Sequence, residues 1–328
     1  MSTQTQHRVF DQSAFNSRAR FAFLGPRGTF CQQALNQIVS EAEGIHLPAL
    51  DAPRAINMVR NGEADYAVVP IENSVEGGIN ATLDTLSRRG DLVIVAEMLV
   101  PITFVLAALP GTEISGIKRI STHNAAWTQC RDWILANLPE VEYLPAASTA
   151  AGAAGLTQSA NPSYDATLVS PLAAKQYQLA VLRDDVADNP NAVTRFVLIG
   201  KAGAVPAPTG HDKTTLMVQL PADGSGALLE MLTQFAALRI NLCRIESRPI
   251  GDSLGRYAFS IDAEGHIAEK RIQSVLAALH RVSPKVTFLG SYPAANASRT
   301  RLAPGTSDED FRSASAWVSG LVHRSIRR

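Results

Sequence analysis

The stretch FAFLGPRGTFCQQALNQI, residues 21–38, joins a short apolar run to an amphipathic segment through a glycine-containing turn. The run at 21–24 has the composition of a short buried strand. After the turn at 25–29, apolar side chains recur at helical spacing, namely Phe30, Ala34, Leu35 and Ile38. Strand, turn and helix in this order form the repeating unit of α/β domains with mostly parallel strands, so the stretch predicts that class for the first part of the chain.

Further junctions between an apolar run and a helical pattern follow at 72–78, 121–124, 148–149 and 170–171. In open α/β sheets, ligands bind beyond the carboxyl ends of the strands, where helix N-termini present unpaired N–H groups and partial positive charge. Serine, threonine and asparagine are also preferred N-caps, so capping explains each of these residues taken alone. Together the junctions predict a cleft that binds a small anion through hydroxyl, amide and backbone donors.

Length and charge restrict the class of protein. The chain has 328 residues, enough for two domains, and its 30 basic and 30 acidic side chains give zero formal charge. A neutral chain does not favour a surface built for nucleic acid or anionic lipid. The three cysteines are widely spaced and form no C-x-x-C pair, which fits a reducing cytoplasm.

One apolar segment has nearly the length of a membrane-spanning helix. Residues 92–110 are interrupted by Glu97 and Pro101 and are rich in valine and isoleucine, so we expect two buried strands that meet at the proline. Residues 1–19 have no apolar core of the kind a secretory signal needs, and we expect a flexible extension there.

Common catalytic motifs are missing from the sequence. The seven histidines show no zinc-binding spacing, and neither a phosphate-binding P-loop nor a G-x-S-x-G elbow is present. At the third junction, His123 is either a general base or a hydrogen-bonded structural residue. Cys31, in the first turn of a helix, is either an activated thiolate or a buried inert thiol.

Five short motifs, in one order, match a known family. They are GPRGTF at 25–30, PIENSVEGG at 70–78, STA at 148–150, NPNAVTRF at 189–196 and IESRP at 245–249. On these motifs the chain resembles monofunctional prephenate dehydratase with a C-terminal ACT domain. The resemblance implies decarboxylating dehydration of prephenate to phenylpyruvate in phenylalanine biosynthesis, with no metal or organic cofactor. It also implies a catalytic domain of two α/β lobes, like a periplasmic binding protein, with the site between the lobes.

The resemblance also implies roles for particular residues. The essential threonine of the family falls on Thr194, which would protonate the departing ring hydroxyl. The substrate-cleft positions fall on Glu72, Asn73, Ser74, Thr122, Ser148, Thr149, Arg195 and Phe196. Two positions depart from the family pattern, because Ala125 stands where glutamine is usual and Cys31 where serine is usual.

The second block independently reads as βαββαβ, a ferredoxin-like pattern typical of ACT domains. By resemblance, this domain would bind L-phenylalanine between two subunits of a homodimer, within an expected homotetramer. The implied effector positions are Gly226, Ala227, Leu228, Leu229, Glu246, Ser247, Arg248 and Pro249. The expected division is an extension at 1–19, the catalytic domain at 20–200 with its second lobe at about 98–184, a linker at 201–213, the ACT domain at 214–292 and a tail at 293–328.

Two alternatives stay open from the sequence. Arogenate dehydratase shares these motifs and accepts an amino group where prephenate has a keto oxygen, and no residue separates the two activities. A non-catalytic amino-acid sensor could use both folds, although Thr194 beside an intact IENS segment favours an enzyme.

Overall fold

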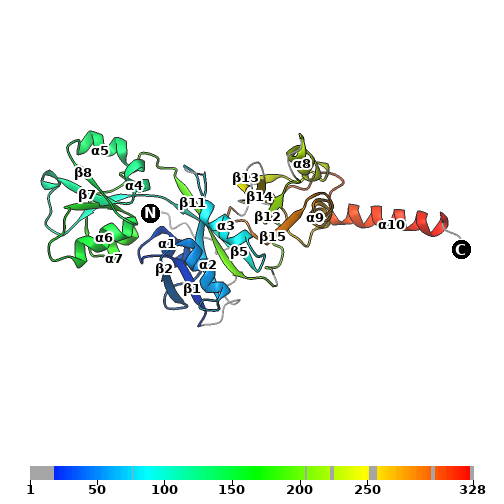
Figure 1. Ribbon diagram of the computed structural model, residues 1–328, viewed down its shortest axis with the longest axis horizontal. Helices are drawn as coiled ribbons and strands as arrows, with labels where there is room; N and C mark the ends of the chain where they lie inside the picture. The colour runs from blue at the N-terminus through cyan, green and yellow to red at the C-terminus, as the bar shows by residue number, and fades with distance from the viewer. Residues whose placement is uncertain are drawn as a thin grey trace. The chain divides into compact units, whose positions relative to one another are not determined.

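The computed structural model describes residues 18–75, 77–203, 205–221, 225–250, 257–296 and 300–325. The expected N-terminal extension therefore lies almost wholly outside the described residues. The chain divides into two compact units: the first runs to Thr82 and resumes at Met98–Ile199, and the second comprises Leu83–Glu97 and the chain from Gly200 onward (Figure 1).

The first sheet of the chain confirms the α/β prediction. Its strand order is β2 (Ile45–Ala49), β1 (Arg20–Leu24), β3 (Tyr66–Asn73), β11 (Val193–Lys201) and β5 (Leu92–Pro101), and the short β4 (Gly77–Gly78) pairs with β3. Strands β1, β2 and β3 are parallel, whereas β11 runs antiparallel to β3. The helices that follow β1, β2 and β4 are α1 (Phe30–Ile38), α2 (Ala52–Arg60) and α3 (Asn80–Ser87).

A second sheet forms the other lobe of the first unit. Its order is β10 (Ala180–Arg183), β6 (Val105–Ala108), β9 (Ala166–Val169), β7 (Arg119–Thr122) and β8 (Glu142–Pro145). The accompanying helices are the 3₁₀ turn η2 (Ile114–Gly116), α4 (Asn124–Gln129), α5 (Arg131–Asn137), α6 (Thr149–Gln158) and α7 (Pro171–Gln176). The small side chains of α6 and α7, such as Ala153 and Ala173, are fully buried and pack in one cluster with Val105 and Val169.

The apolar segment 92–110 forms strands, as its valine content predicted. Strand β5 ends at Pro101 and β6 begins at Val105, and most of their side chains are buried. Among the helices of the described residues, none combines the length and hydropathy that a bilayer crossing requires.

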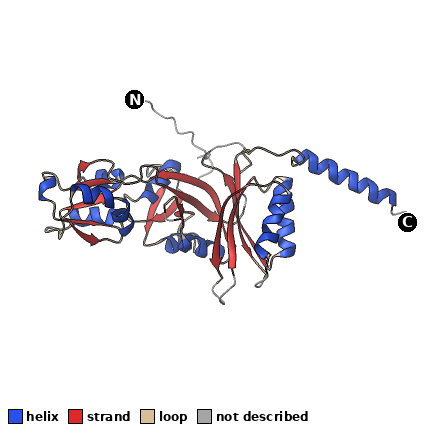
Figure 2. Cartoon of the chain, turned by 90° about the horizontal axis from the view of Figure 1, so that it is seen from above, coloured by secondary structure: helices blue, strands red, loops and turns tan. Residues whose placement is uncertain are grey.

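The second unit contains the predicted βαββαβ order. Strand β12 (Asp212–Gln219) precedes helix α8 (Ala227–Ala237), strands β13 (Leu242–Pro249) and β14 (Tyr257–Glu264), helix α9 (Lys270–Val282) and strand β15 (Lys285–Pro293). The antiparallel sheet has the order β13-β14-β12-β15. Apolar side chains that alternate along β12 and β14 pack with both helices, which lie against one face of the sheet (Figure 2). A last helix, α10 (Asp308–Ser325), buries none of its residues.

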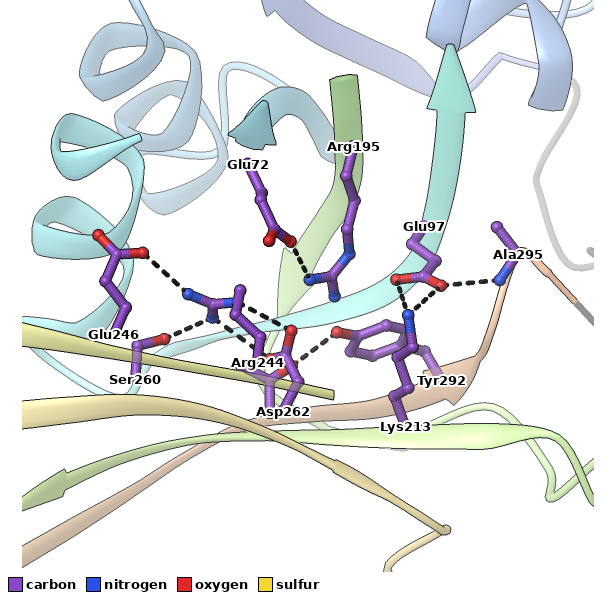
Figure 3. A network of polar contacts seen from close by, with 11 residues as sticks. Glu72, Glu97, Arg195, Lys213, Arg244, Glu246, Ser260, Asp262, Tyr292 and Ala295 are labelled. Carbon is purple, nitrogen blue, oxygen red and sulfur yellow. Dashed lines mark hydrogen bonds and ion pairs between the residues drawn. The ribbon is translucent and has the colours of Figure 1, made fainter. Parts of the chain in front are cut away.

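The other face of this sheet holds a buried polar network (Figure 3). Arg244 donates through Nε and Nη2 to the carboxylate of Asp262, at 3.0 and 3.3 Å. The same guanidinium donates to Ser260 Oγ at 2.6 Å and to Glu246 Oε2 at 3.2 Å. Asp262 also accepts a hydrogen bond from the Thr215 hydroxyl at 2.8 Å. Because Asp262 is fully buried, these donors replace the water that its charge would otherwise require.

Candidate functional site

A cavity of about 290 Å³ lies in the first unit and takes lining residues from both lobes. Its walls are largely apolar and include Leu24, Pro70, Ile102, Phe104 and Phe196. Among the described residues that line it there is no lysine, arginine, aspartate or glutamate. No permanently charged side chain in this lining can pair with a bound anion, so hydroxyl, amide and backbone donors and His123 are the groups present to bind one.

Thr194 and Asn73 form the polar centre of the cavity. They are directly paired across β11 and β3, and Asn73 Nδ2 donates to Thr194 Oγ1 at 2.8 Å. The backbone N–H of Val75 donates to Asn73 Oδ1 at 2.8 Å, which orients the amide so that its NH₂ group faces the threonine. Because Thr194 Oγ1 acts as an acceptor in this contact, its own hydrogen is left to donate to a ligand.

Two helix N-termini face the same cavity. Thr29 caps α1 by accepting from Gln32 N at 3.4 Å, and Ser148 caps α6 by accepting from Ala151 N at 3.0 Å. Thr29, Phe30, Ser148 and Thr149 all line the cavity. The unpaired N–H groups and partial positive charge of these first turns favour a carboxylate. The cavity thus brings together the hydroxyl, amide and helix N-terminal groups of the predicted cleft, and the binding of an anion there stays a prediction.

The structure places the predicted substrate residues in two groups. Thr194, Asn73, Ser148, Thr149 and Phe196 line the cavity, whereas Glu72, Ser74, Thr122 and Arg195 are not among its lining residues.

The second group has other contacts in the structure. Arg195, nearly buried, forms an ion pair with Glu72 at 3.4 Å, drawn in Figure 3. The Ser74 hydroxyl accepts from Val193 N at 2.9 Å, and the fully buried Thr122 hydroxyl donates to Leu168 O at 2.7 Å. These contacts hold β3, β11, β7 and β9 together, and a role of the four residues in substrate binding stays a prediction.

Several lining residues were given no substrate role in the sequence analysis. Ala126 and Gln129 of α4 and Leu50, Ile79 and Ala147 of other segments lie outside the motifs, and Ala125 was noted only as a departure from the family pattern. His123 also lines the cavity, and its Nδ1 accepts from Ala125 N at 3.2 Å, so one ring nitrogen has the structural capping role that was one of its two interpretations. These residues line one cavity only because the two lobes of the first unit pack against each other.

Cys31 has the environment of an inert thiol. It is buried, its Sγ donates to Val68 O at 3.0 Å, and burial raises the pKa of the thiol far above its usual value. Burial likewise raises the pKa of Cys130. The first turn of α1 therefore does not activate Cys31 as a nucleophile.

Thiol labelling checks this conclusion. The Cys243 side chain is accessible to solvent, but partial desolvation raises the pKa of its thiol to about 11. At pH 8 we therefore expect Cys243 alone to react with Ellman's reagent in the folded protein, and to react slowly. Cys31 and Cys130 are expected to react only after denaturation. Peptide mapping identifies the labelled residues, and rapid modification of Cys31 in the native state would contradict the assignment.

The predicted effector residues lie in the second unit, at the start of α8 and the end of β13. Gly226 has φ +94° at the N-cap of α8, a left-handed conformation that favours glycine. Leu229, in the first turn of α8, exposes 68% of its surface. On β13, Arg248 donates from Nε and Nη2 to both carboxylate oxygens of Asp84, at 3.0 and 2.8 Å.

Known proteins of one family resemble this chain over most of its length. The family model for prephenate dehydratase matches residues 21–204. A prephenate dehydratase of Amycolatopsis methanolica is 40% identical over 304 residues, which cover 92% of this chain and 98% of that protein. Among solved structures, a prephenate dehydratase in complex with L-Phe from Arthrobacter aurescens has a TM-score of 0.88 and 51% identity, covering 93% of this chain and 99% of that one.

A second solved structure shows that the fold is compatible with another activity. A protein described as a novel type of quorum-quenching acylase has a TM-score of 0.74 and 29% identity, covering 84% of this chain and 98% of its own. The family model, the curated relative and the solved structure from Arthrobacter nevertheless agree with one another, and each matches more than half of the chain. The chain belongs to the prephenate dehydratase family.

Proposed function

We propose that this chain converts prephenate to phenylpyruvate, carbon dioxide and water, with Thr194 as the proton donor. The observation that supports this most directly is the Asn73–Thr194 pair, in which the amide NH₂ donates to the hydroxyl oxygen and leaves the hydroxyl hydrogen free. The pair lies in a cavity whose two helix N-termini suit a carboxylate substrate.

The reaction makes modest demands on these residues. As the bond between the ring and its carboxylate breaks, carbon dioxide leaves and the electron pair enters the ring. The ring C–O bond breaks on the opposite side of the ring, and the departing hydroxyl takes a proton to form water. Thr194 donates this proton in step with C–O cleavage, since a free threonine is too weak an acid to transfer it beforehand. Solvent then returns a proton to Thr194 Oγ1.

Asn73 has two roles in this mechanism. Its hydrogen bond fixes the Thr194 hydroxyl, and it places positive N–H dipoles beside Oγ1 while negative charge develops there. The low exposure of Thr194, 6%, reduces competition from water for the same hydrogen bond. The cavity thus orients a donor before the reaction, which avoids part of the cost of reorganisation.

The direct test is phenylpyruvate formation from prephenate by the purified full chain. Turnover of prephenate is expected, and arogenate and an acyl-amide substrate are assayed in parallel. Folded protein that turns over only arogenate would overturn the substrate assignment. Binding without turnover of any substrate would support a sensor, and turnover of the acyl-amide alone would support an acylase.

We further propose that the second unit is an ACT-type regulatory domain that binds L-phenylalanine, with a second copy of the chain completing the site. The exposed Leu228 and Leu229 lie in the first turn of α8, where the N–H groups have no partner within the helix and Gly226 provides no side-chain cap. They therefore offer apolar contact beside a binding position for a carboxylate. Cytoplasmic location, the domain limits at 20–200 and 214–292 and pairing into dimers and tetramers belong to the same proposal.

Substitution of Leu229 by alanine tests the effector site. Since this side chain has little contact within the described chain, the variant is expected to unfold at the wild-type temperature. Its affinity for L-phenylalanine is expected to fall by about tenfold or more. Leu321→Ala, an exposed leucine on α10, is the matched control. Calorimetric titration measures both, and equal affinities of the two variants and the wild type would refute the role of Leu229.

A further inference from the structure

Helix α10, red in Figure 1, has an apolar face that the rest of the described chain leaves largely exposed. Its apolar side chains recur every three or four residues and therefore form one stripe along the helix. The members of the stripe are Phe311, Ala314, Trp317, Val318, Leu321 and Val322. Phe311 is half-buried and the other members are exposed, Trp317 by 67%. A contiguous stripe of this kind indicates a surface that a partner covers.

The sequence of α10 gives the helix little stability of its own. It contains Gly320 and four serines, which favour a helix less than alanine or leucine does. The start of the helix is fixed, because Asp308 Oδ1 accepts from Lys270 N at 2.8 Å. From Arg312 to Ser325, however, only Gly320 is even half-buried among the described residues. Since most helical stability in proteins comes from the packing of an amphipathic face, α10 lacks the packing that would stabilise it.

The charges of α10 indicate what kind of partner covers the stripe. Asp308, Glu309 and Asp310 lie in the first turn, whereas His323 and Arg324 lie in the last. Two copies of this helix in parallel would place acidic turn against acidic turn, whereas an antiparallel pair places each acidic turn against a basic one. The helix macrodipoles also attract each other in the antiparallel arrangement.

A lipid surface fits these charges less well. The three acidic residues and two arginines of α10 give it a formal charge of −1, with histidine neutral, and the helix contains no lysine. Helices that lie on anionic membranes are instead rich in lysine and arginine on their polar face.

We propose that α10 pairs antiparallel with α10 of a second copy of this chain and thereby buries the stripe. The inference does not rest on the proposed function, because neither the cavity of the first unit nor the predicted effector positions include a residue of α10. A standard interface buries about 800 Å² per partner, more than a single pair of such helices provides. The α10 pair therefore strengthens an assembly in which the two copies also meet elsewhere.

Two variants of the full chain carry the same added charge on different faces of α10. Ala314→Glu/Val318→Glu places both glutamates in the stripe, so pairing would bury four carboxylates in an apolar contact. This variant is expected to raise the dissociation constant of the assembly by about 100-fold or more. Ala316→Glu/Ser319→Glu places them on the exposed opposite face and is expected to assemble like the wild type.

Sedimentation velocity over a series of protein concentrations measures the assembly, and circular dichroism verifies that each variant folds. Equal assembly of the two variants would overturn the inference, and so would a wild type that is monomeric at every concentration. Leu321→Ala shortens one side chain of the stripe without adding charge. It is expected to leave the assembly in place, so it stays a valid control for Leu229→Ala.

A disulfide tests the orientation of the pair. In antiparallel helices, Phe311 of one copy lies next to Val322 of the other. The two copies of Val322 are then about 16 Å apart along the axis, since eleven residues separate the two positions at 1.5 Å each. That separation is too long for a disulfide.

The cysteines are introduced in a Cys243→Ser background, because Cys243 is exposed whereas Cys31 and Cys130 are buried. After oxidation by diamide, Phe311→Cys/Val322→Cys is expected to form a covalent dimer, and Val322→Cys alone is expected to form none. Non-reducing electrophoresis measures both. A dimer of Val322→Cys alone would indicate parallel helices, and the lack of one in the double variant would also refute the proposed pair.

Discussion

Replacement of Thr194 by valine is expected to lower kcat for prephenate by about 10²–10⁴-fold, the usual contribution of a positioned acid. Valine has nearly the same shape but no hydroxyl, so the loss reports the missing proton donor rather than a change in volume. Thr194 is nearly buried and its hydroxyl contacts Asn73, so no neighbouring hydroxyl is expected to replace it. Steady-state phenylpyruvate formation measures the effect.

Two controls separate chemistry from folding. Thr194→Ser retains the hydroxyl and is expected to keep much more activity than the valine variant. L-phenylalanine binding by Thr194→Val is expected to equal that of the wild type, because the proposed effector site lies in the second unit. A valine variant with wild-type kcat would show that another group protonates the departing hydroxyl.

Replacement of Arg244 by alanine is expected to destabilise the second unit by about 3–5 kcal/mol, the typical cost of breaking a buried ion pair. The loss arises because the variant leaves the buried carboxylate of Asp262 without its positively charged partner. Asp262 is fully buried and would lose two charge-assisted hydrogen bonds, and the neutral Thr215 hydroxyl does not replace the positive charge that is removed. Urea unfolding followed by circular dichroism measures the loss.

An exposed ion pair supplies the comparison. Arg312 contacts Glu309 on α10 at 2.8 Å, but both side chains are largely exposed to solvent. Arg312→Ala is expected to unfold at the wild-type urea concentration, because water solvates the remaining carboxylate. Equal midpoints for Arg244→Ala and Arg312→Ala would contradict the idea that the buried network stabilises the sheet.

Most of the fold could be predicted from the sequence, because the spacing of apolar residues and the composition of each segment indicated the same secondary structure. Valine-rich runs such as 92–95 became buried strands, and the βαββαβ order of the second unit followed from alternation and helical spacing. The polar network around Arg244 and Asp262 was not anticipated. It depends on register, since these two residues face each other only because β13 and β14 pair as they do.

The site was predicted in part, for a similar reason. Ser148 and Asn73 have local signatures in the sequence, because Ser148 precedes the helix α6 that it caps and Asn73 ends the apolar strand β3. Gln129 has none, since it lies at the end of α4 and becomes a cavity residue only when the lobes pack. Thr122 lies at its expected junction and its hydroxyl donates to Leu168 O within the sheet, so its role in substrate binding stays a prediction.

Strand β11 also has a consequence for how the protein is made. It lies between β3 and β5, and Thr194 and Asn73 are 121 residues apart in the chain. A nascent chain that has not yet reached Val193 therefore leaves the edges of β3 and β5 that β11 will cover unpaired, and such edges readily pair with other chains. The second lobe is synthesised in full during this interval. Products that terminate early should then be prone to aggregation, whereas release past β11 closes the sheet and assembles the Thr194–Asn73 pair in one step.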